Sequence, residues 1–141
     1  MRLLAVLVMC GMALLGQKVK PDVDYYDSIS DYFRQSSRAV QAIAQKGIPA
    51  EEIPAVLTIA RRSNMSPNQV IAARKSGKSF ESIAKDAKVA IGGTDFISQA
   101  NLTFLSEYHG QPKPEVQKLR DGGASFIEIN KQYRRSGTKP R

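Results

Sequence analysis

Few residues in this chain of 141 residues have side chains that could carry out acid–base or covalent chemistry. His109 is the only histidine and Cys10 is the only cysteine. A serine triad would have to use His109 as its base, and nothing around the serines resembles the turn that presents a nucleophilic serine. A metal site usually needs several ligands at a defined spacing, so we expect His109 to be a helix-cap or surface residue.

The acidic residues and the glycine pairs give no catalytic pattern either. Glu51 and Glu52 are adjacent, and Asp22 and Asp24 alternate, so neither pair converges on one face as two carboxylates in acid–base catalysis must. Gly92-Gly93 fits neither of the glycine-rich phosphate-binding spacings, and we read it as a turn. We therefore expect a protein that is not an enzyme, with no catalytic residue, no metal ligand and no cofactor.

Basic residues are the remaining source of chemistry. The formal net charge is +8, and the excess lies mainly in residues 60–90 and 111–141. Such an excess favours contact with an anionic partner. It is equally typical of a solvated helix face with cations near helix C-termini. If the excess serves binding, the residues that we select for anion or partner contact are Arg61, Arg62, Arg74, Lys78 and Arg120.

These cations belong to a segment that occurs twice, since residues 70–85 return as residues 116–131 at a constant offset (116 − 70 = 46). The matching residues are Val70, Arg74, Gly77, Ser79, Phe80, Ile83 and Lys85 in the first copy, and Val116, Arg120, Gly123, Ser125, Phe126, Ile129 and Lys131 in the second. A recurrence at fixed offset predicts a duplicated supersecondary unit. A degenerate third copy is expected over residues 40–53.

Each copy has the pattern of an αα-hairpin. The Gly is placed to end one helix at positive φ, and the Ser two residues later is placed to cap the next. In the second copy Glu128 would complete a capping box with Ser125. Arg74 and Arg120 then have two roles open to them. They could present two guanidinium groups to an anionic partner, or each could bond carbonyls at its own helix end and cover the nearby Phe, which we favour.

The chain begins with a short apolar run, MRLLAVLVMCGMALLG, which predicts a signal peptide over residues 1–16. It is shorter than the roughly 20 residues of a membrane span. Whether the leader is cleaved or retained as an anchor, and whether Cys10 is lipidated, stay open. We expect a polar linker over residues 17–27, a helical domain over residues 28–135 and a basic tail over residues 136–141. The leader predicts an exported protein, periplasmic or secreted, without a span in the mature chain.

The predicted fold is all-α, a small bundle of six or seven short helices. Apolar residues at helical spacing predict one long helix from Ser28 to Gly47, and Thr94 is the expected cap of a later helix. The aromatic residues Tyr25, Tyr26, Tyr32 and Phe33 are expected in the core. No run of alternating apolar residues predicts a strand.

The motif of the two copies, R-x-x-G-x-S-F-x-x-I, resembles that of uncharacterised small exported bacterial proteins built from repeated helical hairpins. The resemblance covers about residues 53–131, and this chain has Phe80 and Phe126 where that family commonly has Trp. It implies no activity.

Together these features predict an exported, non-enzymatic helical protein that binds an unknown protein or an anionic component of the envelope. The alternative is a basic, nucleic-acid-binding protein, because residues 77–85 look like the start of a helix-turn-helix motif. Gly92-Gly93 would break the recognition helix of that motif.

Overall fold

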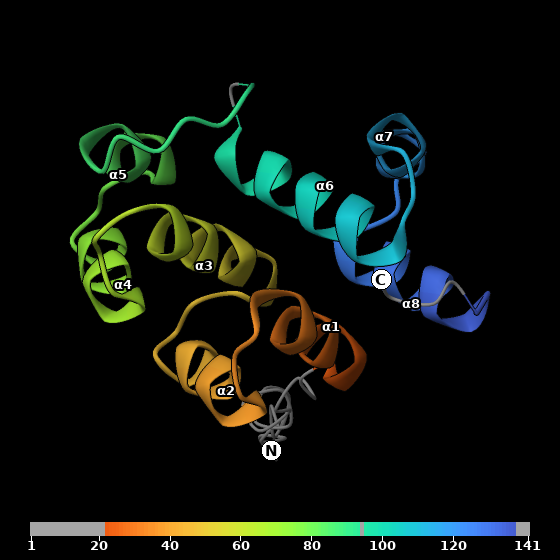
Figure 1. Cartoon of the computed structure of the whole chain (residues 1–141), viewed down its shortest axis with the longest axis horizontal. Coiled ribbons are helices and arrows are strands. Elements are labelled where there is room, and N and C mark those ends of the chain that lie inside the picture. The colour runs from red at the N-terminus through yellow and green to blue at the C-terminus, as the bar shows by residue number, and fades with distance from the viewer. Residues whose placement is uncertain (1–21, 94, 138–141) are drawn as a thin grey trace, which may run out of the picture.

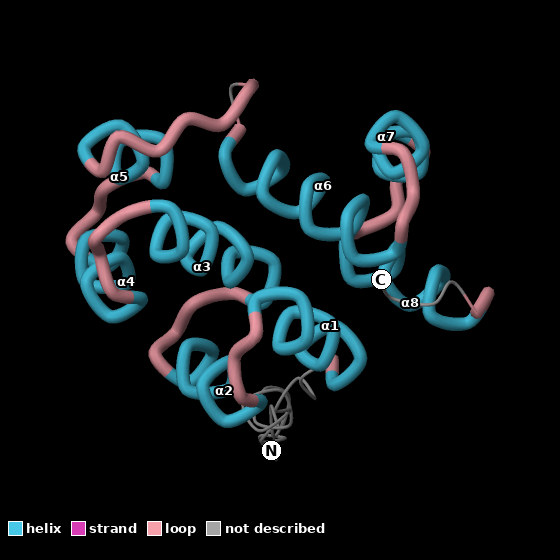
Figure 2. Tube along the Cα trace, in the orientation of Figure 1, coloured by secondary structure: helices cyan, strands magenta, loops and turns pink. Residues whose placement is uncertain are grey.

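The computed structural model describes residues 22–93 and 95–137, and every regular element in these two ranges is a helix (Figures 1 and 2). The all-α prediction is confirmed, but six or seven helices were too few. Eight α-helices and one 3-10 helix, η1 (Ala50–Glu52), occur there: α1 Val23–Phe33, α2 Ser37–Gln45, α3 Ile53–Arg62, α4 Pro67–Lys75, α5 Phe80–Asp86, α6 Phe96–His109, α7 Lys113–Asp121 and α8 Phe126–Arg135. The predicted signal peptide, Cys10, Thr94 and residues 138–141 of the predicted tail lie outside the described residues.

Helix α3 lies in the middle of the molecule (Figure 1). All side chains from Ile53 to Ile59 are buried, and the helix contacts α1, α2, α4, α5 and α6. A helix that is apolar on all sides has to be enclosed by other elements. Five α-helices therefore surround α3, whereas α7 and α8 pack against α6 and α1. The charged end of α3, Arg61-Arg62, reaches the surface.

The predicted long helix from Ser28 to Gly47 is wrong, because it is divided into α1 and α2. Arg34 adopts the left-handed conformation (φ 54°) after α1, and the side chain of Ser36 caps α2 by accepting a hydrogen bond from the Ala39 N–H. The Ser30 hydroxyl donates to the backbone carbonyl of Gln35 and holds the corner. A residue other than glycine in this conformation is uncommon, so an arginine at this position does not indicate a break.

The start of the helical domain also differs from the prediction. Asp22 accepts a hydrogen bond from the Tyr25 N–H, which lets α1 begin at Val23 rather than at Ser28. Residues 23–27 of the predicted linker are therefore helical. Farther along, the N-cap of α6 is Asp95, whose side chain accepts from the Ser98 N–H.

The corner between α1 and α2 has a counterpart between α6 and α7. The Ser106 hydroxyl donates to the backbone carbonyl of Gln111, just as that of Ser30 does to Gln35 (106 − 30 = 76). Gly110 has the left-handed conformation there that Arg34 has in the first corner. Two corners far apart in sequence therefore use the same hydrogen bonds.

Two helix pairs, α4–α5 and α7–α8, have the local geometry that the sequence predicts. Gly77 and Gly123 have φ angles of +103° and +100°, and Ser79 and Ser125 cap the following helices. Ser125 also forms a capping box with Glu128. None of the helices in the described part of the chain has the length and apolar composition that crossing a membrane requires.

The positive φ of Gly123 makes this position require glycine, which a substitution can test, with the neighbouring Gly122 as the control. Gly123→Ala should lower the free energy of unfolding by about 1–2 kcal/mol, since a Cβ at this φ is strained even where space is open. Gly122 has φ −75°, so Gly122→Ala should change stability by less than about 1 kcal/mol. Urea denaturation of both variants measures the difference. Equal effects would contradict the assigned backbone conformation.

Candidate functional site

The five cations selected from the sequence lie on three separate parts of the fold. Arg61 and Arg62 end α3, Arg74 and Lys78 lie at the end of α4 and just after it, and Arg120 lies on α7. Helices α4 and α7 are at opposite ends of the long axis of the molecule (Figure 1). The structure therefore brings Arg74 and Lys78 together but gives the five residues no common site, and Arg74 and Arg120 cannot grip one small anion.

Arg74 is held by three groups. Its Cζ lies 4.8 Å from the ring centroid of Phe80, Nη1 donates to the carbonyl oxygen of Lys78 at 3.3 Å, and Nη2 donates to Glu52 at 2.9 Å. Stacking of a guanidinium on an aromatic ring is attractive, and the ion pair is half-buried. Arg74 thus joins α4, α5 and η1.

Arg120 repeats two of these three contacts. Its Cζ lies 4.7 Å from the ring centroid of Phe126, and Nη1 donates to the carbonyl oxygen of Ala124 at 3.1 Å. No ion pair of Arg120 occurs among residues 22–93 and 95–137. Both arginines therefore make the contacts of the role that we favoured, bonding a carbonyl beyond the helix end and covering the Phe.

Arg61 and Arg62 point to different neighbours. Arg61 donates from Nη2 to the carbonyl oxygen of Tyr32 on α1 at 2.8 Å, whereas Arg62 donates weakly, at 3.5 Å, to that of Ala90 between α5 and α6. Lys78 pairs with Asp86 at 3.4 Å, and both side chains are more than half exposed. A pair of that kind contributes little to stability.

A buried polar group that the sequence analysis missed connects three elements. Asn101 on α6 accepts a hydrogen bond from the hydroxyl of Tyr25 on α1 and donates to the carbonyl oxygens of Glu51 (2.8 Å) and Ile97 (2.9 Å). Tyr25 and Asn101 are both fully buried. Burial is the main reason that the pKa of Tyr25 is raised well above its usual value, so this hydroxyl stays protonated. One feature of the sequence could have revealed this group: Asn101 is a polar residue on the otherwise apolar face of α6.

His109 is a core residue, so the expectation of a cap or surface position was wrong. Its side chain is 3% exposed, and Nε2 lies 2.9 Å from Oδ1 of Asn130. The rings of Tyr108 and Tyr133 lie 4.8 and 5.2 Å from its ring. His109 is on the inner face of the last turn of α6, and the left-handed Gly110 turns the chain only after it. The Nδ2 of Asn130 has no hydrogen-bond partner among the described residues.

The acidic residues are used mainly to hold helix N-termini and tyrosines. Backbone N–H groups bond to Asp22, Glu51, Glu81, Asp95 and Glu128, and the hydroxyls of Tyr108 and Tyr32 bond to Asp31 and Glu107. Burial and the bond to Glu107 raise the pKa of Tyr32 to about 12. No group of three or more His, Cys, Asp or Glu side chains that could hold a metal ion occurs in the described ranges.

The helix that follows α5 matters for the nucleic-acid alternative. In a helix-turn-helix motif that helix would lie in the DNA groove and expose one face. Here it is α6, which packs against α3, α1, α7 and α8, and Glu107 is its one exposed residue. The geometry after residues 77–85 thus differs from that of a recognition helix.

Comparison with known proteins identifies no relative, since no family model, curated protein or solved structure matches the chain.

The burial of His109 predicts how stability changes with pH. Burial lowers the pKa of His109 below the usual 6.5, and the charge of Arg134 adds to this, against the opposing bond to Asn130. The folded protein therefore binds this proton less readily than the unfolded chain. The stabilisation is complete above about pH 6.5 and is lost as the pH falls below it.

As the only histidine, His109 gives an isolated imidazole signal in NMR spectra. Its titration should yield a pKa below 6.5. Urea denaturation between about pH 7.5 and 5.5 should show a larger loss of stability for the wild type than for His109→Gln, which cannot take up the proton. Parallel losses, or an imidazole pKa above 6.5, would contradict the buried position.

Proposed function

We propose that this chain is an exported, non-enzymatic binding protein whose partner is an anionic component of the envelope or an acidic protein surface. The leader over residues 1–16 is the basis for export to the periplasm or beyond. The burial of His109 within the core supports a role other than catalysis, since a general base has to reach its substrate.

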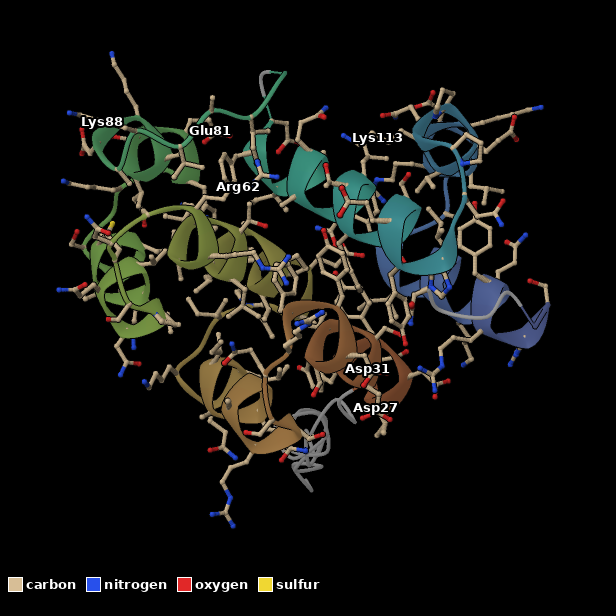
Figure 3. The ribbon with its side chains drawn as sticks, viewed as in Figure 1. Asp27, Asp31, Arg62, Glu81, Lys88 and Lys113 are labelled. Atoms are coloured by element: carbon tan, nitrogen blue, oxygen red, sulfur yellow. The ribbon has the colours of Figure 1, made fainter. Side chains whose placement is uncertain are left out.

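The observation that carries the proposal is that most carboxylates of the fold bond to N–H groups or tyrosines, and few pair with Lys or Arg. Among the described residues only three ion pairs occur, Arg74–Glu52, Lys78–Asp86 and Arg134–Asp24. Most carboxylates are instead bound to N–H groups or tyrosines, so most exposed Lys and Arg side chains have no carboxylate partner. Figure 3 shows two of these, Lys88 just after α5 and Lys113 at the start of α7, well separated on the surface. Unpaired surface cations attract anionic partners from a distance.

We also propose that α4–α5 and α7–α8 are copies of one duplicated helix pair, with a degenerate copy at residues 40–53. The equal stacking of Arg74 and Arg120 on their Phe rings supports this, as does the positive φ of Gly47, Gly77 and Gly123. On this proposal the Arg, Gly, Ser, Phe and Ile of the shared motif serve folding, and binding depends on exposed lysines.

Capture of partners from the envelope of the native cells, with tagged full-length chain, tests the binding role. Two charge-reversed variants, Lys85→Glu with Lys88→Glu and Lys118→Glu with Lys131→Glu, alter exposed lysines at the two ends of the molecule. At least one of them should lose the partner, and retention by the wild type should fall as salt is raised.

The matched control is the pair Arg74→Gln and Arg120→Gln. Arg120→Gln should lower the free energy of unfolding by about 1 kcal/mol through loss of stacking and a hydrogen bond, with the partner retained. Arg74→Gln should lower it further, because the ion pair with Glu52 is also lost. Retention that is insensitive to salt and to both lysine variants would contradict the proposal. Release of the partner by nuclease would favour the nucleic-acid alternative, and recovery of the chain in the cytoplasm with its leader intact would overturn export.

A further inference from the structure

A small pocket lies where the corner between α1 and α2 meets the end of α3 and the start of α4. Its volume is about 260 Å³, and it is lined by Phe33, Gln35, Leu57, Ala60, Arg61 and Pro67. Phe33 and Leu57 are 6% and 4% exposed, so the walls belong to the core and are fixed by it. Arg61 and Gln35 are the polar members, and both are exposed.

The guanidinium of Arg61 is held in place before any ligand arrives. Its Cζ lies 5.0 Å from the ring centroid of Tyr32 and 4.9 Å from that of Phe33, and Nη2 donates to the carbonyl oxygen of Tyr32. Nε and Nη1 donate to no backbone or carboxylate oxygen in the described ranges, although the guanidinium also interacts with the Tyr32 side chain. A planar donor group that is already immobilised loses little entropy when it binds an anion.

Arg61 also has no carboxylate partner among the described residues, whereas Arg74 and Arg134 pair with Glu52 and Asp24. Glu107 accepts a hydrogen bond from the hydroxyl of Tyr32, the ring beside which the Arg61 guanidinium lies. The pocket therefore combines apolar walls with one uncompensated positive charge.

The second corner shows that the corner itself does not need this arginine. Between α6 and α7, Ser106 and Gln111 form the same hydrogen bonds as Ser30 and Gln35. At the offset of 76 residues that relates the two corners (61 + 76 = 137), the counterpart of Arg61 is Gly137. The same type of corner thus forms without an arginine at this position, so the cation beside the first corner is available for a separate role.

We propose that this pocket binds a carboxylate carried on a compact apolar group. The carboxylate lies on the open edge of the Arg61 guanidinium, where its two oxygens match the planar donors, and the apolar group lies against Phe33, Leu57 and Ala60. One guanidinium matches a monoanion in charge. The volume is below the roughly 300–1,000 Å³ of pockets for drug-sized ligands, so the apolar group is about the size of one side chain.

A free small acid and the carboxyl-terminal residue of a polypeptide both offer this chemistry. The pocket proposal names a ligand class for the proposed binding protein, and it rests on the proposed function only in assuming a binding role. Direct titration with defined probes succeeds or fails independently of capture from the envelope.

The test is an NMR titration of the full-length chain with 3-phenylpropanoate and with the tripeptide Gly-Gly-Phe. Its backbone amide signals at Phe33, Gln35 and Ala60 should shift, with a Kd on the order of 1 mM for so small a ligand. The uncharged 3-phenylpropanamide and acetate, which lacks the apolar group, should each bind at least about tenfold more weakly. Tighter binding of the tripeptide indicates a polypeptide terminus as the source, and tighter binding of 3-phenylpropanoate indicates a free acid.

Three variants locate the site. Arg61→Gln should weaken binding at least about tenfold, and Ala60→Leu should abolish it by filling the pocket while Arg61 remains. Arg62→Gln is the control, because its guanidinium turns toward Ala90 and does not line the pocket. If Arg61→Gln unfolds, Ala60→Leu still decides. Binding that is equal for the amide, unaffected by Ala60→Leu, weakened equally by Arg62→Gln, or absent with both probes would overturn the proposal.

Discussion

The burial of α3 is the constraint on which the rest of the structure depends. From Ile53 to Ile59 every side chain of this helix is buried, so neighbours must cover it on all sides. Each fully buried Val, Ile or Leu contributes about 1.5–3 kcal/mol relative to an exposed one, and no single helix could provide that cover. The neighbours are short, and they are positioned by their corners, where Ser30 and Ser106 or the glycines Gly77 and Gly123 turn the chain.

The surface charge of the protein follows partly from this packing. Many short helices have many N-termini, whose N–H groups and dipoles favour carboxylates. Glu81 and Asp95 are used at the start of α6, and Glu51 and Glu128 at the start of α8. Carboxylates engaged in this way do not pair with lysine or arginine. The cations are consequently left on the surface, where an anionic partner can reach them.

Much of the local structure could be predicted from the sequence because it depends on neighbouring residues. Gly77 and Gly123, Ser79 and Ser125, and the spacing of each Arg from its Phe define geometry within a few residues. The break at Arg34 could not be predicted, because an arginine gives no signal of left-handed backbone. His109 was misplaced for another reason, since its burial depends on Asn130 and Tyr133 from α8, which are far from it in sequence. The pocket beside Arg61 brings together residues from α1, α3, α4 and the α1–α2 corner, which no local pattern reveals.

Native-state hydrogen exchange tests the central role of α3 most directly. If the other helices are organised around α3, its amides should be the slowest to exchange and should open only with global unfolding. Amides of α4 and α7, at the ends of the molecule, should exchange through smaller local openings. Amides of α3 that exchange as fast as those of α7 would contradict the account.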